Sequence, residues 1–223
     1  MDPLIVTPRL KLTLLTKAER GSPEFKWLHE LHSNEKSIVG GRARSMEDAE
    51  MNMTCYLPTN KEDGLYRIAY AVHRILDSTE TPTEFIGLVT LRSLDANCLP
   101  LPEELTLPAA AAATILTVEI AYSFLPAGWG KGYATESVKA MFECCRRAQS
   151  FWAPFSKVYV RAIVNGENGA SARVMEKTGM VKRGVYEWKG KAVLVGGRWR
   201  ERDSISIFGM HLLGGEEQTR PLA

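Results

Sequence analysis

The stretch FLPAGWGKGYATES, residues 124–137, places three glycines within five residues, directly before a helix-like pattern. The run that precedes it alternates apolar and polar residues and predicts a strand. A helix leaves about four unpaired backbone N–H groups in its first turn, which together carry about half a positive charge. Gly128, Gly130 and Gly132 put no side chain in front of those groups, and Lys131 adds a cation. The stretch therefore predicts a strand, a turn and a helix whose backbone amides bind an anionic group such as a pyrophosphate.

This glycine turn, residues 126–132, does not match the common nucleotide-binding loops. A Walker loop requires Ser or Thr after its lysine, whereas Lys131 is followed by Gly132. A dinucleotide-binding fold requires GxGxxG, and GWGKGY lacks the third glycine. The residues alone leave two interpretations open: a site for a phosphate-bearing ligand, or a glycine-rich turn that serves only close packing of the strand on the helix.

The composition is that of an ordinary soluble globular protein of one domain. The chain has 223 residues, of which 45% are hydrophobic and 24% charged, and a net charge of +2. Its basic residues are spread along the chain, which argues against nucleic acid as a partner. No apolar run is long enough for a membrane helix, and the first residues do not fit a signal peptide. The four cysteines lack metal-ligand spacing, so we expect reduced thiols in a cytoplasmic protein.

The order of the predicted elements indicates an α+β fold with a mixed sheet. Strands are predicted over residues 10–14, 66–74, 84–93, 115–124, 157–164, 181–188 and 203–212, and helices over 23–34, 45–56, 132–151 and 170–178. Ser22 and Ser45 are the expected caps of the first two helices.

Two segments stand outside this pattern. Residues 94–114 hold three prolines and five successive alanines, and are interpreted as a loop insertion that either closes over a site or covers a face of the sheet. We expect a flexible tail over residues 214–223, so that the domain spans residues 1–213.

Four segments, in the same order and spacing, resemble one known family. TVEIAYSFLPAGWGKGYATESV (117–138) is similar to the acyl-CoA-binding signature of the GCN-five-related N-acetyltransferases (GNAT), in the branch of the ribosomal-protein-alanine N-acetyltransferases of the RimJ and RimL type. YVRAIVNGENGASARVMEKTGMVKRGV (159–185), GGRWRERDSISI (196–207) and TPRLKLTLLT (7–16) resemble further GNAT segments. The resemblance implies a single-domain GNAT-like fold, with a mostly antiparallel sheet that is splayed at the acyl-CoA site and flanked by helices.

The resemblance also implies how the donor is bound. The amides of the glycine turn would hold the CoA pyrophosphate, and the strand before it would pair with the pantetheine arm and donate an N–H to the thioester oxygen. Ala127 stands where the family has Arg or Gln, at a position that acts mainly through its backbone. The residues that the resemblance assigns to acetyl-CoA are Tyr122, Phe124, Leu125, Trp129, Gly130, Lys131, Gly132, Tyr133, Ala134, Thr135, Asn168 and Ser171.

The catalytic residues implied by the resemblance are Glu119, Ser171 and Asn168. Glu119 is the candidate base that removes the proton of the amine, and its alternative role is structural, as a salt bridge or an exposed strand residue. Met175 occupies the position of the tyrosine acid of many relatives, so Ser171 or a water is expected near the leaving thiolate. Asn168 and Ser171 fit equally well as a helix cap.

The expected function is transfer of acetyl from acetyl-CoA to a primary amine, by direct attack in a ternary complex. The acceptor is either a small-molecule amine or a protein N-terminus, and the protein is a monomer or homodimer without a metal, nucleic acid or membrane partner. Two alternatives remain: a catalytically silent acyl-CoA-binding protein, and a nucleotide-binding regulator. His29 and His32 either line the acceptor site or share a helix surface, and the surface interpretation is preferred.

Overall fold

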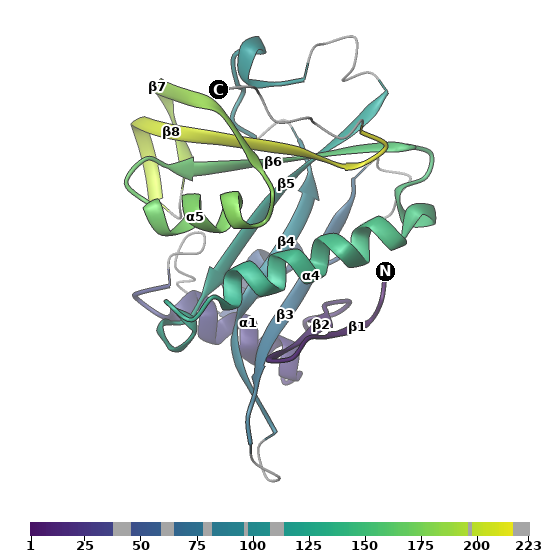
Figure 1. Ribbon diagram of the computed structural model, residues 1–223. Helices are drawn as coiled ribbons and strands as arrows, with labels where there is room; N and C mark the ends of the chain where they lie inside the picture. Colours follow the sequence, from purple (N-terminus) through teal and green to yellow (C-terminus); the bar gives the residue numbers. More distant parts are fainter. Residues whose placement is uncertain are drawn as a thin grey trace.

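The computed structural model describes residues 1–37, 46–58, 65–77, 82–95, 98–107, 114–195 and 198–215. These residues form a single eight-stranded sheet with the order β1-β2-β3-β4-β5-β6-β8-β7 (Figure 1). The pair β5–β6 is parallel, and every other neighbouring pair is antiparallel. The mixed, mostly antiparallel sheet predicted from the sequence is confirmed.

The strands follow the predicted positions, with one addition. Their bounds are β1 (Leu4–Val6), β2 (Leu10–Leu14), β3 (Arg67–Ile75), β4 (Thr83–Ser93), β5 (Ile115–Phe124), β6 (Lys157–Asn165), β7 (Val181–Val195) and β8 (Arg198–Leu213). The three residues of β1 are too few to show a period and were not predicted. β7 and β8 extend beyond their predicted ends as a long hairpin, which continues across a register shift between Lys189 and Val193.

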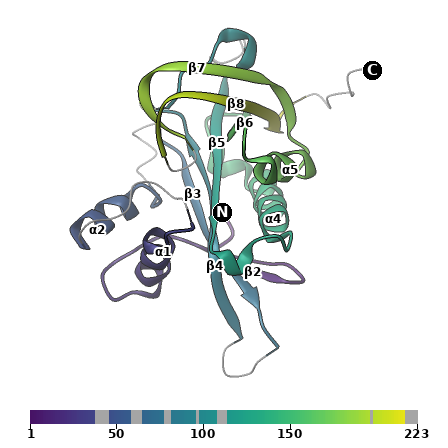
Figure 2. The same ribbon diagram turned by 90° about the vertical axis from the view of Figure 1, so that its left-hand side faces the viewer.

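Helices cover both faces of the sheet. They are α1 (Pro23–Ser33), α2 (Met46–Thr54), α4 (Tyr133–Arg147) and α5 (Gly169–Lys177). Figure 2 shows α1 and α2 on one side of the sheet and α4 and α5 on the other. The Ser22 side chain accepts a hydrogen bond from the amide of Phe25, which confirms the predicted cap, whereas Ser45 lies outside the described residues.

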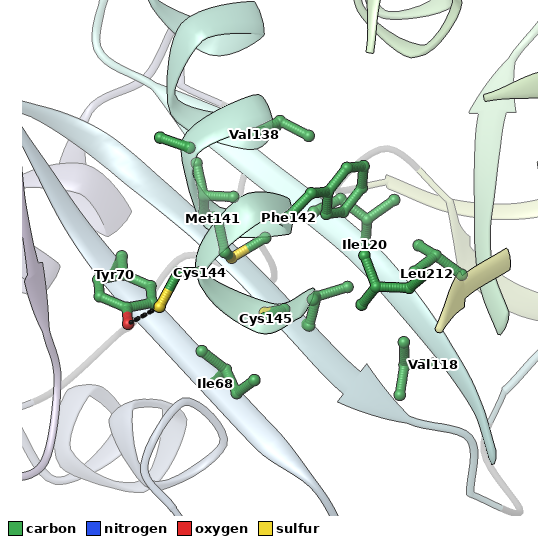
Figure 3. Close-up of a cluster of buried hydrophobic side chains, with 14 of the residues drawn as sticks. Ile68, Tyr70, Val118, Ile120, Val138, Met141, Phe142, Cys144, Cys145 and Leu212 are labelled. Carbon is green, nitrogen blue, oxygen red and sulfur yellow. Dashed lines mark hydrogen bonds between the residues drawn. The ribbon is translucent and has the colours of Figure 1, made fainter. Parts of the chain in front are cut away.

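The main core lies between α4 and the sheet. Cys144 and Cys145 are almost fully buried there, next to Tyr70 of β3 (Figure 3). The hydroxyl of Tyr70 donates to the carbonyl of Asp2 and lies 3.5 Å from the sulfur of Cys144. All four cysteines are unpaired. α4 ends at Arg147, four residues before its predicted end, and a 3-10 turn (Gln149–Trp152) follows.

β5 and β6 separate part-way along their length. Their pairing runs from Ile115 with Lys157 to Glu119 with Arg161. Beyond that step, β5 continues to Phe124 paired only with β4, and β6 continues to Asn165 paired only with β8. The predicted splay is therefore present, and it opens toward the end of β5 that leads into the glycine turn.

Residues 98–107, which make up most of the described part of the insertion, cover the sheet near its far edge. Leu99 is buried against Trp188, Ile205 and Ile207, and Leu105 packs on the same cluster. This confirms that part of the insertion lies on a sheet face. The tail from residue 216 onward lies outside the described residues. In the part of the chain that the structure describes, no helix is long and apolar enough to cross a membrane.

Candidate functional site

The glycine turn connects β5 to α4 through two residues in the left-handed region. Gly130 has φ +69° and Gly132 has φ +79°, a backbone conformation that favours glycine. The N-cap of α4 is Gly132, which offers no side chain to cap the helix. Within the described residues, the amides from Gly130 to Thr135 donate to no acceptor. The turn thus presents a continuous run of free N–H groups at a helix N-terminus, next to the exposed Lys131.

Part of the β5 edge is already used by the protein itself. The indole Nε1 of Trp129 donates to the Phe124 carbonyl at 2.6 Å. Leu125 donates its amide to Ile86 and accepts from Gly128, and its side chain is buried on the face of α1. The backbone edge left open toward β6 therefore begins at Ile120, and the Trp129 indole occupies the Phe124 carbonyl near its other end. Leu125, which the sequence assigned to the donor, has both backbone groups occupied.

Three sequence-predicted residues meet where α5 begins. The Asn168 side chain accepts from the Ser171 amide at 3.0 Å, so it caps α5. The Tyr122 hydroxyl, from β5, donates to the Ser171 carbonyl at 3.4 Å. Burial raises the pKa of Tyr122, and the contact with Ser171 opposes that change. The predicted capping role of Asn168 is therefore present in the structure. Met175, at the position where many relatives have a tyrosine, is buried in the core.

Glu119 lies at the last paired step before β5 and β6 diverge. Its Oε2 accepts from Nε of Arg161 at 3.0 Å, and its Oε1 lies 3.6 Å from NH2 of Arg92. The side chain of Arg161 is 7% exposed and that of Glu119 15%. Arg161 also donates to the Leu99 carbonyl at 3.3 Å, which ties this group of residues to the insertion. We call Arg92, Glu119 and Arg161 the Glu119 cluster.

The Glu119 cluster lies on the face of the sheet opposite α4. Val118 and Ile120, the neighbours of Glu119, are in the core under α4. Ala121, two residues along on the same side as Glu119, is exposed although β5 lies inside the sheet. We call this side of β5 the acceptor face. It is bordered by α1 and α2 on one side and by residues 98–107 on the other.

His32 corrects the expectation of a surface histidine. It is 6% exposed, its Nε2 lies 3.1 Å from the Tyr56 hydroxyl of the segment after α2, and burial lowers its pKa. It lies among the buried residues of α1, and its ring packs edge-on against that of Tyr56, which explains the burial. His29 is exposed, as predicted. Among the described residues, no group of His, Cys, Asp and Glu side chains could hold a metal ion.

The arginines of this region were not found from the sequence. Arg92 and Arg161 belong to strands whose alternation gave no sign of a role. Arg9 belongs to a segment that points to the family only by resemblance.

A family model described as the acetyltransferase (GNAT) domain matches residues 9–181. The chain belongs to the GNAT acetyltransferase family.

Solved structures of GNAT proteins share the fold at low sequence identity. An acetyltransferase from Bacillus anthracis is 20% identical, with a TM-score of 0.56, over 94% of this chain and 98% of that one. RimL, a ribosomal L7/L12 α-N-protein acetyltransferase in complex with coenzyme A, is 15% identical, with a TM-score of 0.58, over 93% and 97%. Spermidine N-acetyltransferase from Vibrio cholerae, in complex with CoA and spermine, is 17% identical, with a TM-score of 0.53, over 90% and 95%. No curated protein sequence matches this chain significantly.

Proposed function

We propose that this GNAT protein transfers an acetyl group from acetyl-CoA to a primary amine, by direct attack in a ternary complex. The observation that carries the proposal is the separation of β5 and β6 immediately beyond Glu119, at the end of β5 that leads into the free amides of the glycine turn. A donor bound along that opening would have its pyrophosphate on the turn and its thioester near Glu119. The exposure of Ala121 supports access for the acceptor from the other face.

The chemistry requires an amine without its extra proton, a stabilised oxyanion and a leaving thiolate. In the proposed reaction, the amine nitrogen forms a bond to the thioester carbon, the C–S bond breaks, and the amine proton is lost. We assign the oxyanion to a backbone N–H on the free part of β5. Glu119 takes the amine proton through Oε1, the oxygen without a short contact, either directly or through water.

The thiolate receives a proton from Ser171 or from water. Ser171 is held in the first turn of α5 by its amide bond to Asn168 and by the Tyr122 contact at its carbonyl. Those contacts use the backbone of Ser171 and leave its hydroxyl available. Asn168 thus has a positioning role through the cap, in addition to the donor contact that the family resemblance implies.

The acceptor we propose is a small-molecule amine, with a protein N-terminus as the second choice. Residues 98–107 lie against the sheet next to the Glu119 cluster and so narrow the acceptor face on one side. Restricted access favours a compact acceptor over a folded protein surface. The related structures carry both kinds of name, a polyamine acetyltransferase and a protein N-terminal acetyltransferase.

The test is thiol release from acetyl-CoA with a panel of amines: peptides with free N-termini, polyamines, arylamines and amino acids. Release with one class would establish the activity and identify the acceptor chemistry. Affinity for acetyl-CoA is measured in parallel by calorimetry. Tight binding without thiol release for any amine would contradict the proposed activity and favour a silent acyl-CoA-binding protein.

A further inference from the structure

We propose that Arg9 is a positioning residue that holds the glycine turn in the shape that binds the donor. Arg9 lies in the short connection between β1 and β2, 122 residues from the turn in the sequence. Its backbone carbonyl accepts from the Ile75 amide, which fixes the connection to the end of β3. Its guanidinium reaches across to the turn and to the first turn of α4. The inference rests on the proposed use of acyl-CoA.

The Arg9 guanidinium makes contacts on three sides. NH1 donates to the Lys131 carbonyl at 3.0 Å, and Nε donates to Glu136 Oε2 at 2.8 Å. The guanidinium also lies over the ring of Tyr133, 4.9 Å from its centre. Glu136 accepts a second bond from the Thr7 hydroxyl at 2.6 Å. Both ends of the β1–β2 connection are therefore bound to the start of α4.

These contacts brace a turn that has no side-chain helix cap, and they leave its amides free. Gly130 and Gly132 are the residues with the least intrinsic preference for one conformation, and Gly132 provides no capping side chain. A turn of this kind would lose conformational entropy when it closes on a phosphate group. Arg9 limits that loss because it fixes the Lys131 carbonyl between the two glycines and leaves the amides facing outward.

Arg9 also contributes charge at the same place. Its NH2 lies 3.6 Å from the position that a side-chain carbon on Gly132 would occupy, and half of its side chain is exposed. Glu136, which is paired with Arg9 and whose side chain is 19% exposed, offsets part of this charge. Arg9 and Lys131 together give the turn a positive field that favours a pyrophosphate.

The prediction is specific to the part of the donor that contacts the turn. Arg9→Met should raise the KM for acetyl-CoA about tenfold, with kcat nearly unchanged. Acetyl-pantetheine, a donor without the pyrophosphate and nucleotide, should be used equally well by the variant and by the unmodified protein. Arg9→Lys should recover part of the lost affinity, since it keeps the charge and one hydrogen bond.

Arg147→Met is the matched control, because Arg147 also joins the N-terminal segment to α4, through Asp2 at 3.2 Å, at the far end of the helix. It should leave both donors unaffected. Equal loss with acetyl-CoA and acetyl-pantetheine, or no change in Arg9→Met, would overturn the proposal. Calorimetry with CoA separates the role of Arg9 from the proposed activity. If the protein acetylates no amine, the proposed activity fails. A loss of CoA affinity in Arg9→Met, but not in Arg147→Met, would still support the role of Arg9.

Discussion

The two ends of the proposed reaction are built in different ways on the same strand. At the C-terminal end of β5, the donor end consists of consecutive residues, the glycine turn and the first turn of α4, with free amides and two left-handed glycines. In the middle of β5, the acceptor face brings together Arg92 of β4, Glu119 of β5, Arg161 of β6 and the Leu99 carbonyl. The donor end is made of backbone and is open, whereas the Glu119 cluster is made of side chains, of which Glu119 and Arg161 are mostly buried and Arg92 is exposed. Changes at the donor end should therefore act on binding, and changes in the Glu119 cluster on stability and turnover.

The largest effect is expected from Gly130→Glu. The residue has positive φ, and nothing lies within 4 Å in front of it, so the new carboxylate would project into the space proposed for the pyrophosphate. We expect acetyl-CoA affinity to fall about a thousandfold, equivalent to about 4 kcal/mol. Calorimetry of acetyl-CoA binding measures the change.

The control for that variant is Gly21→Glu, because Gly21 also has positive φ and open space but lies before α1. Both variants introduce the same backbone strain and the same charge, so their unfolding midpoints should shift by similar amounts. An acetyl-CoA affinity that falls equally in both variants, or in neither, would show that the glycine turn is not the donor site.

The second effect is a loss of stability in Arg161→Met. The change leaves the carboxylate of Glu119 mostly buried without its shorter hydrogen bonds, and it also removes the donor to the Leu99 carbonyl. Breaking such a buried pair costs about 3 kcal/mol of unfolding free energy, measured by denaturant titration. Arg74→Met breaks a more exposed Arg–Glu pair between β3 and β4, with Glu84, and should cost less than about 1 kcal/mol. Equal costs would mean that the Glu119 cluster is not a special feature of the acceptor face.

The contrast between a site of consecutive residues and a site of residues distant in the sequence explains what could be predicted from the sequence. The glycine turn, the strand before it and the Asn168–Ser171 cap each depend on residues at most a few positions apart, and local patterns identify them. The partner of Glu119 is 42 residues away and that of Arg9 is 127 residues away in Glu136, so no period or motif connects them. Glu119 was recognised as important with two open roles. Its salt bridge is observed, and its role as base remains a proposal.

The burial of His32 could not be predicted for the same reason. The helical period of α1 leaves several positions near the boundary between its buried and its exposed face. The contact with Tyr56, after α2, places His32 on the buried side. The insertion shows the opposite case, since its apolar composition did indicate that it packs on the sheet. Composition predicts burial, but it does not select the partner.

Glu119→Gln tests the acceptor face directly. The amide keeps the shape of the side chain and can still accept from Arg161, but it is no longer a base. Turnover at neutral pH should fall about a hundredfold, with acetyl-CoA affinity unchanged. Glu84→Gln, which alters the carboxylate of the Arg74 pair, is the control and should leave turnover unaffected. A rate at the level of the unmodified protein from roughly pH 6 to pH 9 would exclude Glu119 as the base.

The smallest effect is expected when the pH is lowered. It should reduce the unfolding free energy through His32 of α1, which contacts Tyr56 after α2. Burial, with a smaller contribution from the charge of His29, lowers the pKa of His32 below its ordinary value of about 6.5. The unfolded chain therefore binds a proton at a higher pH than the folded protein does. Stability from this group is complete above about pH 6.5 and declines as the pH falls toward the lowered pKa, by at most about 1.4 kcal/mol for each pH unit.

His32→Gln can still bond to the Tyr56 hydroxyl but does not titrate, so it should make the decline of unfolding free energy between about pH 6.5 and pH 5 less steep. His73, which is also buried with a lowered pKa, would account for part of the slope that remains. The glycine turn contains no histidine and should keep its shape over this range. Unchanged steepness in His32→Gln would place the acid sensitivity elsewhere and remove this distinction between the donor end and the acceptor face.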